Sequence, residues 1–213
     1  RTLLQQAHVL YGLPLKLVLS EHAYGCATAC NLGADLARAP HLLLMQENVL
    51  PCHYGWLETM WKYYQQQEHI GVLGPTLLFD NDIIRDAGMS VFMTPENSTS
   101  FGVHPVGRGH GKAWLEDRQA EEVPAVSSAC MLIEKALFEE SGGFDGYFLS
   151  GEFEGLHLCF KLTEKGLTHF CTPENTLYHL EEPISDNDQL ASSLNTRLFY
   201  AYWQTQLEAL FAR

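Results

Sequence analysis

Three segments of this chain lie where the carboxyl ends of strands are expected, and they carry residue types that bind or transfer a substrate. They span residues 45–51, 127–130 and 142–162. In open α/β sheets, ligands bind beyond the carboxyl ends of the strands, so we expect these segments to meet at one edge of a sheet. Carboxylates and an imidazole there suit proton transfer, and amide or carboxylate oxygens suit a cation. The candidate side chains are Gln46, Glu47, Asn48, Ser127, Ser128, Glu152, Glu154 and His157.

The elements that must position these groups alternate between strand and helix. Residues 27–38 predict a helix whose inward face carries small side chains, and residues 41–46 predict a buried strand. A helix at 54–67 and a strand at 70–73, ended by Gly74-Pro75, follow. This alternation is typical of βαβ units and a mainly parallel sheet. The other expected elements are a helix at 2–11, strands at 15–20, 123–133, 169–171 and 176–180, and helices at 135–140, 155–165 and 187–212.

Two segments outside this alternation have a distinct composition. Residues 94–122 show no strong periodicity, which predicts either a functional loop or a plain surface loop. The helix at 187–212 is amphipathic, so it should pack on the domain or on a second copy of the chain. Its expected packing face carries Leu190, Leu194, Leu198 and Ala201, and the loop carries His104, Arg108, His110, Lys112 and Trp114.

Composition narrows the class of protein. The 213 residues include 26 acidic and 13 basic side chains, for a formal charge of −13, which makes nucleic acid an unsuitable partner. No apolar run reaches the length of about eighteen residues that predicts a transmembrane segment. The six cysteines form no Cys-x-x-Cys pair, which predicts free thiols in a reducing compartment. We therefore expect a cytoplasmic protein, or one at the inner face of a membrane.

A succession of short motifs runs through residues 15–182. In chain order they are Asn31-Leu32-Gly33, residues 46–48 with Pro51, Gly55-Trp56-Leu57, Gly74-Pro75, residues 84–88, residues 123–133, Gly142-Gly143-Phe144-Asp145, residues 158–162, Gly166 and His179. In order and spacing this succession resembles the family 2 glycosyltransferases, which have the GT-A fold. The resemblance implies an α/β, Rossmann-like, mainly parallel sheet flanked by helices.

The resemblance also implies a domain plan and a reaction. Residues 1–185 would form the glycosyltransferase domain without the family's first nucleotide-binding strands, and residues 186–213 the C-terminal helix. The family transfers a sugar, with inversion, from a nucleotide-sugar donor to a glycan or lipid-linked glycan, as in O-antigen and other cell-surface polysaccharide synthesis. Ser127, Ser128 and Asp145 would then help to bind the substrates.

The first departure from the family concerns its metal site. An Asp-x-Asp motif normally binds Mg²⁺ or Mn²⁺, because a hard cation prefers oxygen ligands and neutralises the departing diphosphate. Here Gln46, Glu47 and Asn48 occupy that position. His179 matches a late family histidine that completes the metal shell, although a structural histidine is the alternative. A cation on Glu47, Asn48 and His179 would be held weakly.

The second departure concerns the catalytic base. An inverting transfer needs a group that takes the proton of the acceptor hydroxyl. One alignment places Glu154 at the family's Glu, Gly155 where the base Asp belongs, and His157 two residues later; another places Glu152 at the Glu. The same acids could instead complement a helix dipole. Both departures leave two functions open, a glycosyltransferase and a non-catalytic module for glycan binding or assembly.

Arg85 and Asp86 form a further charged pair between Ile84 and Ala87. The pair could lie near the sugar, but a solvated surface pair is the simpler interpretation.

Overall fold

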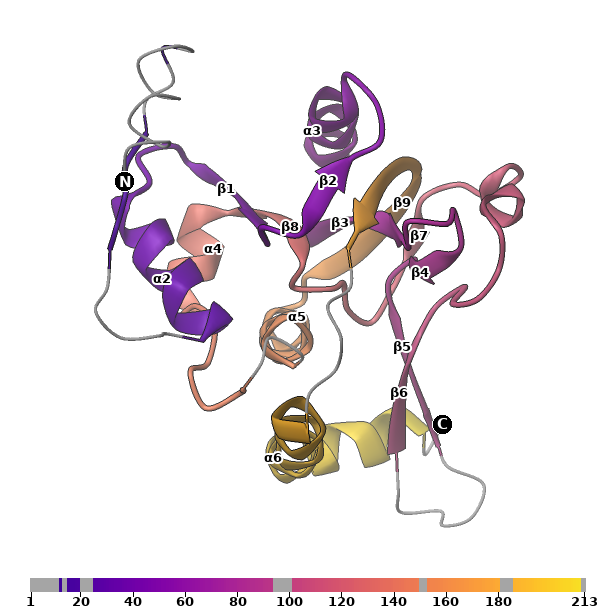
Figure 1. Cartoon of the computed structure of the whole chain (residues 1–213). Coiled ribbons are helices and arrows are strands. Elements are labelled where there is room, and N and C mark those ends of the chain that lie inside the picture. Colours follow the sequence, from indigo (N-terminus) through magenta and orange to yellow (C-terminus); the bar gives the residue numbers. More distant parts are fainter. Residues whose placement is uncertain are drawn as a thin grey trace.

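The computed structural model describes residues 12, 15–19, 25–93, 101–149, 153–180 and 186–211. Its centre is a seven-stranded sheet in the order β1-β8-β3-β9-β2, with β4 paired to β3 and β7 paired to β9 (Figure 1). The strands are β1 (His41–Met45), β2 (Val49–Pro51), β3 (Ile70–Leu78), β4 (Ile84–Asp86), β7 (Glu121–Glu122), β8 (Cys130–Glu134) and β9 (Thr168–His179).

The prediction of a central sheet flanked by helices is confirmed, but the strand directions are mixed. β3 and β9 pair in parallel, whereas β8 runs antiparallel to both of its neighbours, β1 and β3. β2, β4 and β7 also pair antiparallel. Among the described strands the sheet is therefore mixed, since most neighbouring strands are distant in the sequence and are not joined by the expected βαβ crossovers.

β3 is the core strand, and all nine of its residues are buried. It continues through Gly74-Pro75, where the sequence predicts an end, and the register with β9 shifts just after Pro75. A side chain at Gly74 would meet Val126, since an added Cβ would lie 2.8 Å from the Val126 Cβ. Glycine here lets the neighbouring segment approach. β9 is one continuous strand where the sequence predicts two.

Helices cover the two faces of the sheet. α3 (Trp56–Gln66) lies on one side, and α5 (Glu154–Glu164) lies on the other with α6 (Asp186–Phe211) beyond it (Figure 1). α2 (Cys26–Leu36) and α4 (Lys135–Glu140) lie near the β1 end. The small residues Ala27 and Ala34 of α2 are buried, as their spacing predicts. None of the helices that the structure describes combines the length and apolar character needed to cross a bilayer.

Two of the sequence motifs bind each other directly. The Asn31 side chain donates to the Phe144 carbonyl at 2.8 Å and accepts from the Phe144 amide at 2.9 Å. Gly143 has φ +66°, and an added Cβ would lie 2.6 Å from the Asn31 Oδ1. The Asn-x-Gly and Gly-Gly-Phe-Asp motifs therefore form one structural joint between α2 and the loop after α4.

The predicted packing face of the C-terminal helix is wrong. Leu190 and Leu194 are 61% and 46% exposed and Ala201 is also exposed, while Leu198 is half-buried. The buried face of α6 begins one residue after the predicted face. Phe199 and Trp203 bury large aromatic side chains there. The Asn195 side chain also exchanges two hydrogen bonds with the Leu149 backbone. That face consists of Ala191, Asn195, Phe199, Trp203 and Leu207.

Two further expectations change. Residues 15–19 form no strand and their apolar side chains are exposed, because no described strand pairs with them. The irregular loop expected at 94–122 is partly ordered as a hairpin of β5 (Met89–Met93) and β6 (Phe101–Pro105), followed by the short 3-10 helix η1 (Lys112–Leu115). The expected helix at 2–11 lies outside the described residues.

Candidate functional site

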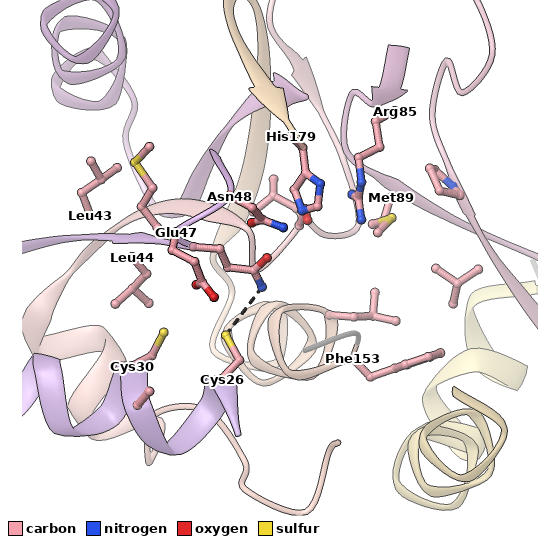
Figure 2. A pocket seen from close by; sticks show the side chains of 18 of the residues that line it. Cys26, Cys30, Leu43, Leu44, Glu47, Asn48, Arg85, Met89, Phe153 and His179 are labelled. Carbon is pink, nitrogen blue, oxygen red and sulfur yellow. Dashed lines mark hydrogen bonds between the residues drawn. The ribbon is translucent and has the colours of Figure 1, made fainter. Parts of the chain in front are cut away.

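A cavity of about 1290 Å³ lies where the segment after β1 meets α2, β4, the β5–β6 hairpin and α6. Polar residues after β1 face Phe153 and Leu156 at the start of α5 across this space. Each of the three segments expected to meet at one edge of the sheet therefore contributes residues to one cavity. Its polar lining includes Cys26, Cys30, Gln46, Glu47, Asn48, Arg85, Arg108, Ser127 and His179 (Figure 2).

The three residues at the Asp-x-Asp position point in different directions. Gln46 donates through its amide to the Cys26 sulfur at 3.5 Å. Glu47 is exposed and turns toward α2, on the side of Cys26 and Cys30 (Figure 2). Asn48 turns toward β9 and donates to the Leu180 carbonyl at 3.0 Å. The surviving carboxylate therefore faces away from the amide that replaces the family's metal ligand.

His179 and Arg85 occupy the wall beside Asn48. His179, at the end of β9, pairs with Val49 and is 7% exposed. Arg85 extends from β4 next to the His179 ring and ends in the cavity (Figure 2). Strand pairing thus places Asn48, His179 and a guanidinium group on one side of the cavity, although they lie far apart in the sequence.

The interpretation of Arg85 and Asp86 as a solvated pair is wrong. Asp86 is 1% exposed and the Arg85 side chain 21%, and the Arg85 Nη1 lies 2.6 Å from the Asp86 Oδ2. Burial raises the pKa of Asp86, and the positive charges of Arg85 and Arg108 oppose that rise. In β4 the alternation of sides buries Ile84 and Asp86 and turns Arg85 toward the cavity. This alternation is the sequence signal that marks Arg85.

The residues present fit a divalent cation poorly. No group of three His, Cys, Asp or Glu side chains in the described ranges could hold a metal ion. Asn48 and His179 are neutral donors, and the Glu47 carboxylate lies on the α2 side. The Asn48 Oδ1 is buried and accepts no hydrogen bond within the described part of the chain. Mg²⁺ and Mn²⁺ prefer anionic oxygen, so these groups alone would bind them weakly.

The start of α5 has no room for the family's base aspartate. An added Cβ at Gly155 would lie 2.8 Å from the Ser128 backbone nitrogen. The glycine therefore allows α5 to pack directly on residues 127–128. Glu154, the preceding residue, is fully buried. A hydrogen bond with Cys26 and burial raise the pKa of Cys30 in the cavity wall, and the negative charge of Glu154 adds a smaller contribution. Glu152 lies outside the described residues.

His157 is engaged in packing and faces away from the open cavity. Its Nδ1 accepts a hydrogen bond from the Trp203 indole at 2.8 Å, so the neutral ring carries its proton on Nε2. That nitrogen lies 3.6 Å from the Asp145 Oδ2. Burial, reinforced by the positive charge of Lys161, lowers the pKa of His157 to about 4. The ring therefore ties α5 to α6, and its acceptor nitrogen is already occupied.

Of the three remaining residues predicted to bind substrate, one lines the cavity and two are engaged in packing or loop structure. Ser127 lines the cavity, and its hydroxyl accepts from the Ala129 amide at 3.3 Å. Ser128 is 4% exposed beneath α5. Asp145 accepts from the Tyr147 amide at 3.0 Å and faces His157, which shapes the loop after α4. Ser127 alone of these three lines the cavity.

Of the aromatic and basic residues in the former loop, Arg108 lines the cavity. Its guanidinium lies 5.2 Å from the centre of the Phe79 ring. His110 instead stacks on Trp114, with ring centroids 5.5 Å apart. Of the five loop residues expected near the site, Arg108 is therefore the one that lines the cavity.

Two cysteines of the lining were missed as site residues. Cys26 and Cys30 lie one turn apart on α2 and share a face (Figure 2). A hydrogen bond from Cys30 lowers the pKa of Cys26 to about 6, and the same interaction raises the pKa of Cys30. The i, i+4 spacing was the available signal, since it places both sulfurs on one face of a helix.

Comparisons with known proteins agree with this architecture. The chain is 28% identical over 175 residues to the O-antigen biosynthesis protein RfbC of Myxococcus xanthus, covering 76% of this chain and 12% of that protein. The structure of GalNAc-T7 with UDP, GalNAc and Mn²⁺ superposes with a TM-score of 0.64 at 17% identity, covering 85% of this chain and 35% of the other. No protein-family model matches the chain.

A second solved structure gives the same result. It is the mannosyltransferase PcManGT of Pyrobaculum calidifontis with GDP-Man and Mn²⁺, with a TM-score of 0.55, 15% identity, and coverage of 91% of this chain and 46% of the other. The chain thus spans less than half the length of each of these three proteins. The likeness to these two solved structures shows that the chain has the GT-A fold.

Proposed function

We propose that this domain transfers a sugar from a nucleotide-sugar donor to a glycan acceptor. The observation that carries the proposal is the single cavity shared by the segment after β1, His179, Arg85 and the start of α5. The GT-A fold supports it, because proteins of that fold were solved with UDP and GalNAc or with GDP-Man. The similarity to RfbC supports a role in O-antigen or related cell-surface polysaccharide synthesis.

The reaction we propose inverts the anomeric centre. The acceptor hydroxyl oxygen forms a bond to the anomeric carbon, the bond from that carbon to the diphosphate oxygen breaks, and the nucleoside diphosphate leaves with the electron pair. A carboxylate takes the hydroxyl proton. Glu154 and Glu152 are our candidates for that group, and Ser127 for a contact with the sugar. His157 and Asp145 position the α5 region through their contacts with Trp203 and Tyr147.

We propose that residues 1–185 form the glycosyltransferase domain and that residues 186–213 form a helix packed on it. The exposed Leu190, Leu194 and Tyr202 of α6 would suit a second copy of the chain in a homodimer. A lipid-linked acceptor would bring the domain to the inner face of a membrane.

Calorimetry with UDP-, GDP- and dTDP-sugars, each in EDTA and in Mn²⁺, tests the proposed function. We expect one nucleotide class to bind and to be turned over with a glycan acceptor. Glu154→Gln should abolish turnover while leaving donor binding intact. Failure of all three donor classes to bind under either condition would contradict the proposal.

A second candidate is a non-catalytic module that binds glycan. The packing of Gly155 on Ser128 and the neutral donors at Asn48 and His179 favour it, because the family's base and metal positions are both substituted. A module would bind oligosaccharide in the same calorimetric experiment and show no affinity for nucleotide sugars. Fold alone does not separate the two functions, since activity depends on the site.

A further inference from the structure

The cavity wall beside Asn48 and His179 carries two guanidinium groups. Arg85 and Arg108 both line the cavity. Their backbones are held together, because the Ile84 amide donates to the His110 carbonyl at 2.7 Å and the Gly109 amide donates to the Ile84 carbonyl at 2.9 Å. Ile84, which precedes Arg85, is thus hydrogen-bonded to Gly109, which follows Arg108. Both arginines line the same cavity.

The Arg85 guanidinium is oriented before any ligand binds. The buried Asp86 carboxylate contacts its Nη1 at 2.6 Å, and only 21% of the Arg85 side chain is exposed. Arg108 is supported by the Phe79 ring at 5.2 Å. An arginine fixed in this way loses little conformational entropy when it binds an anion, and its planar donors match phosphate oxygens.

The charge distribution makes this wall unusual for the chain. The protein carries twice as many acidic as basic residues, 26 to 13, yet two of its few arginines meet here. The carboxylate of Glu47 lies across the cavity, on the α2 side (Figure 2). The two guanidinium charges exceed the single Asp86 carboxylate beside them, so an anion would be drawn to the Arg85 and Arg108 side of the cavity, away from Glu47.

Resting on the proposed function, we propose that Arg85, supported by Arg108, binds the donor diphosphate and neutralises it as it leaves, in place of a cation held by an Asp-x-Asp motif. The nucleoside diphosphate departs as an anion when the anomeric carbon–oxygen bond breaks, so charge builds up on its oxygens. A guanidinium beside Asn48 and His179 stands where that charge develops. In this arrangement the Arg85 guanidinium takes the place of the metal ion that an Asp-x-Asp motif would bind.

Calorimetry of UDP, GDP and dTDP binding in EDTA tests this inference. We expect the wild-type chain to bind one of them without metal, Arg85→Gln to weaken that binding at least about tenfold, and Arg108→Gln to weaken it less. Arg85→Lys should retain part of the affinity, since it keeps the charge and loses the planar fork. Arg118→Gln is the matched control, because Arg118 pairs with Glu121 outside the cavity lining.

The outcomes separate the inference from the function on which it rests. Binding that requires Mn²⁺, or binding in EDTA that Arg85→Gln leaves unchanged, overturns the inference and keeps the proposed function. Absence of nucleotide binding in both EDTA and Mn²⁺ overturns both. If Arg85→Gln unfolds because Asp86 loses its partner, the double variant Arg85→Gln/Asp86→Asn removes both charges, and the same loss of affinity is expected.

Discussion

The region around α5 and the cavity wall use polar side chains in opposite ways. Around α5, Asn31 bonds the Phe144 backbone, Asn195 bonds the Leu149 backbone, and Trp203 bonds His157, so each polar group meets another part of the chain. We call this set of three contacts the α5 brace. Along the cavity wall, Glu47 is exposed, and Arg85 is held by Asp86 with its guanidinium at the cavity.

This difference explains where the family resemblance holds and where it departs. The motifs that match the family, such as Asn31-x-Gly33 and Gly142–Asp145, belong to the α5 brace or to strand packing. The departures, at residues 46–48 and Gly155, border the cavity or the packing beneath it. The matching motifs are therefore engaged in packing, whereas the substituted positions border the cavity or the contact beneath it.

The largest loss of stability expected from a single substitution comes from adding a side chain at Gly155, where α5 packs on Ser128. Gly155→Ala places a Cβ 2.8 Å from the Ser128 backbone nitrogen, which only a backbone shift can relieve, so we expect a loss of about 3 kcal/mol in unfolding free energy. Urea unfolding measures it. The matched control is Gly33→Ala, also in a helix but with nothing within 4 Å of the added Cβ, which should stabilise by about 0.5–1 kcal/mol. Equal effects of the two variants would contradict the close packing of α5.

Acid should weaken the fold around the buried histidines. The pKa values of His157 and His169 are both lowered to about 4 by burial, so the unfolded chain takes up protons between about pH 6.5 and pH 4 that the folded chain does not. The stabilisation is therefore complete above pH 6.5 and is lost as the pH falls toward 4, on the order of 2 kcal/mol for each histidine. Urea midpoints across this range measure the loss, and a flat profile would contradict it.

A smaller effect isolates one contact of the α5 brace. Trp203→Phe removes the hydrogen bond that the indole donates to the His157 Nδ1, so we expect a loss of about 1 kcal/mol and a rise in the pKa of His157. Titration of the His157 ring by NMR measures the rise. Tyr202→Phe, at an exposed ring that also contacts His157, should leave the titration unchanged. If Trp203→Phe leaves the pKa of His157 unchanged, the Trp203 indole is not the hydrogen-bond donor to His157.

On the cavity side, the smallest expected effect is a change in thiol reactivity without loss of stability. Cys26, with its pKa lowered to about 6, should be alkylated by iodoacetamide faster than Cys130 or Cys159, whose pKa values burial raises to about 12. The rate should rise through pH 6 and level off above it. Cys30→Ala removes the main cause of the lowering and should move this rise to higher pH. Mass spectrometry of the labelled peptides separates the sites.

Periodicity was sufficient to predict most of the elements. Residues 135–140 predict and form α4, and the helices expected at 54–67 and 155–165 form within two residues of those bounds. Local sequence patterns gave the wrong prediction where a residue distant in sequence determines the structure. β3 continues through Gly74-Pro75 because Val126 packs against the glycine, and α6 buries Asn195 because Leu149 supplies backbone partners.

The site was predictable in position and less so in chemistry. A strand end predicted residues 46–48 at the site, the family resemblance predicted His179, and all four residues line one cavity. Ser128 leaves no room for a side chain at Gly155, and Trp203 donates a hydrogen bond to His157. Both partners are distant in sequence, so local patterns do not reveal these contacts. The orientation of Arg85 follows from the alternation of sides in β4, but no strand was predicted there, so Asp86 was interpreted as solvated.

The most direct test of the donor site is protection of Cys26 by a nucleotide sugar. Cys26 lines the same cavity as Arg85, His179 and Asn48, so a donor bound there would shield its thiolate. We predict that the UDP-, GDP- or dTDP-sugar that binds in calorimetry slows Cys26 alkylation, while the labelling of Cys52, outside the cavity lining, is unchanged. A donor that binds by calorimetry and leaves the Cys26 rate unaltered would show that the sugar nucleotide occupies another site.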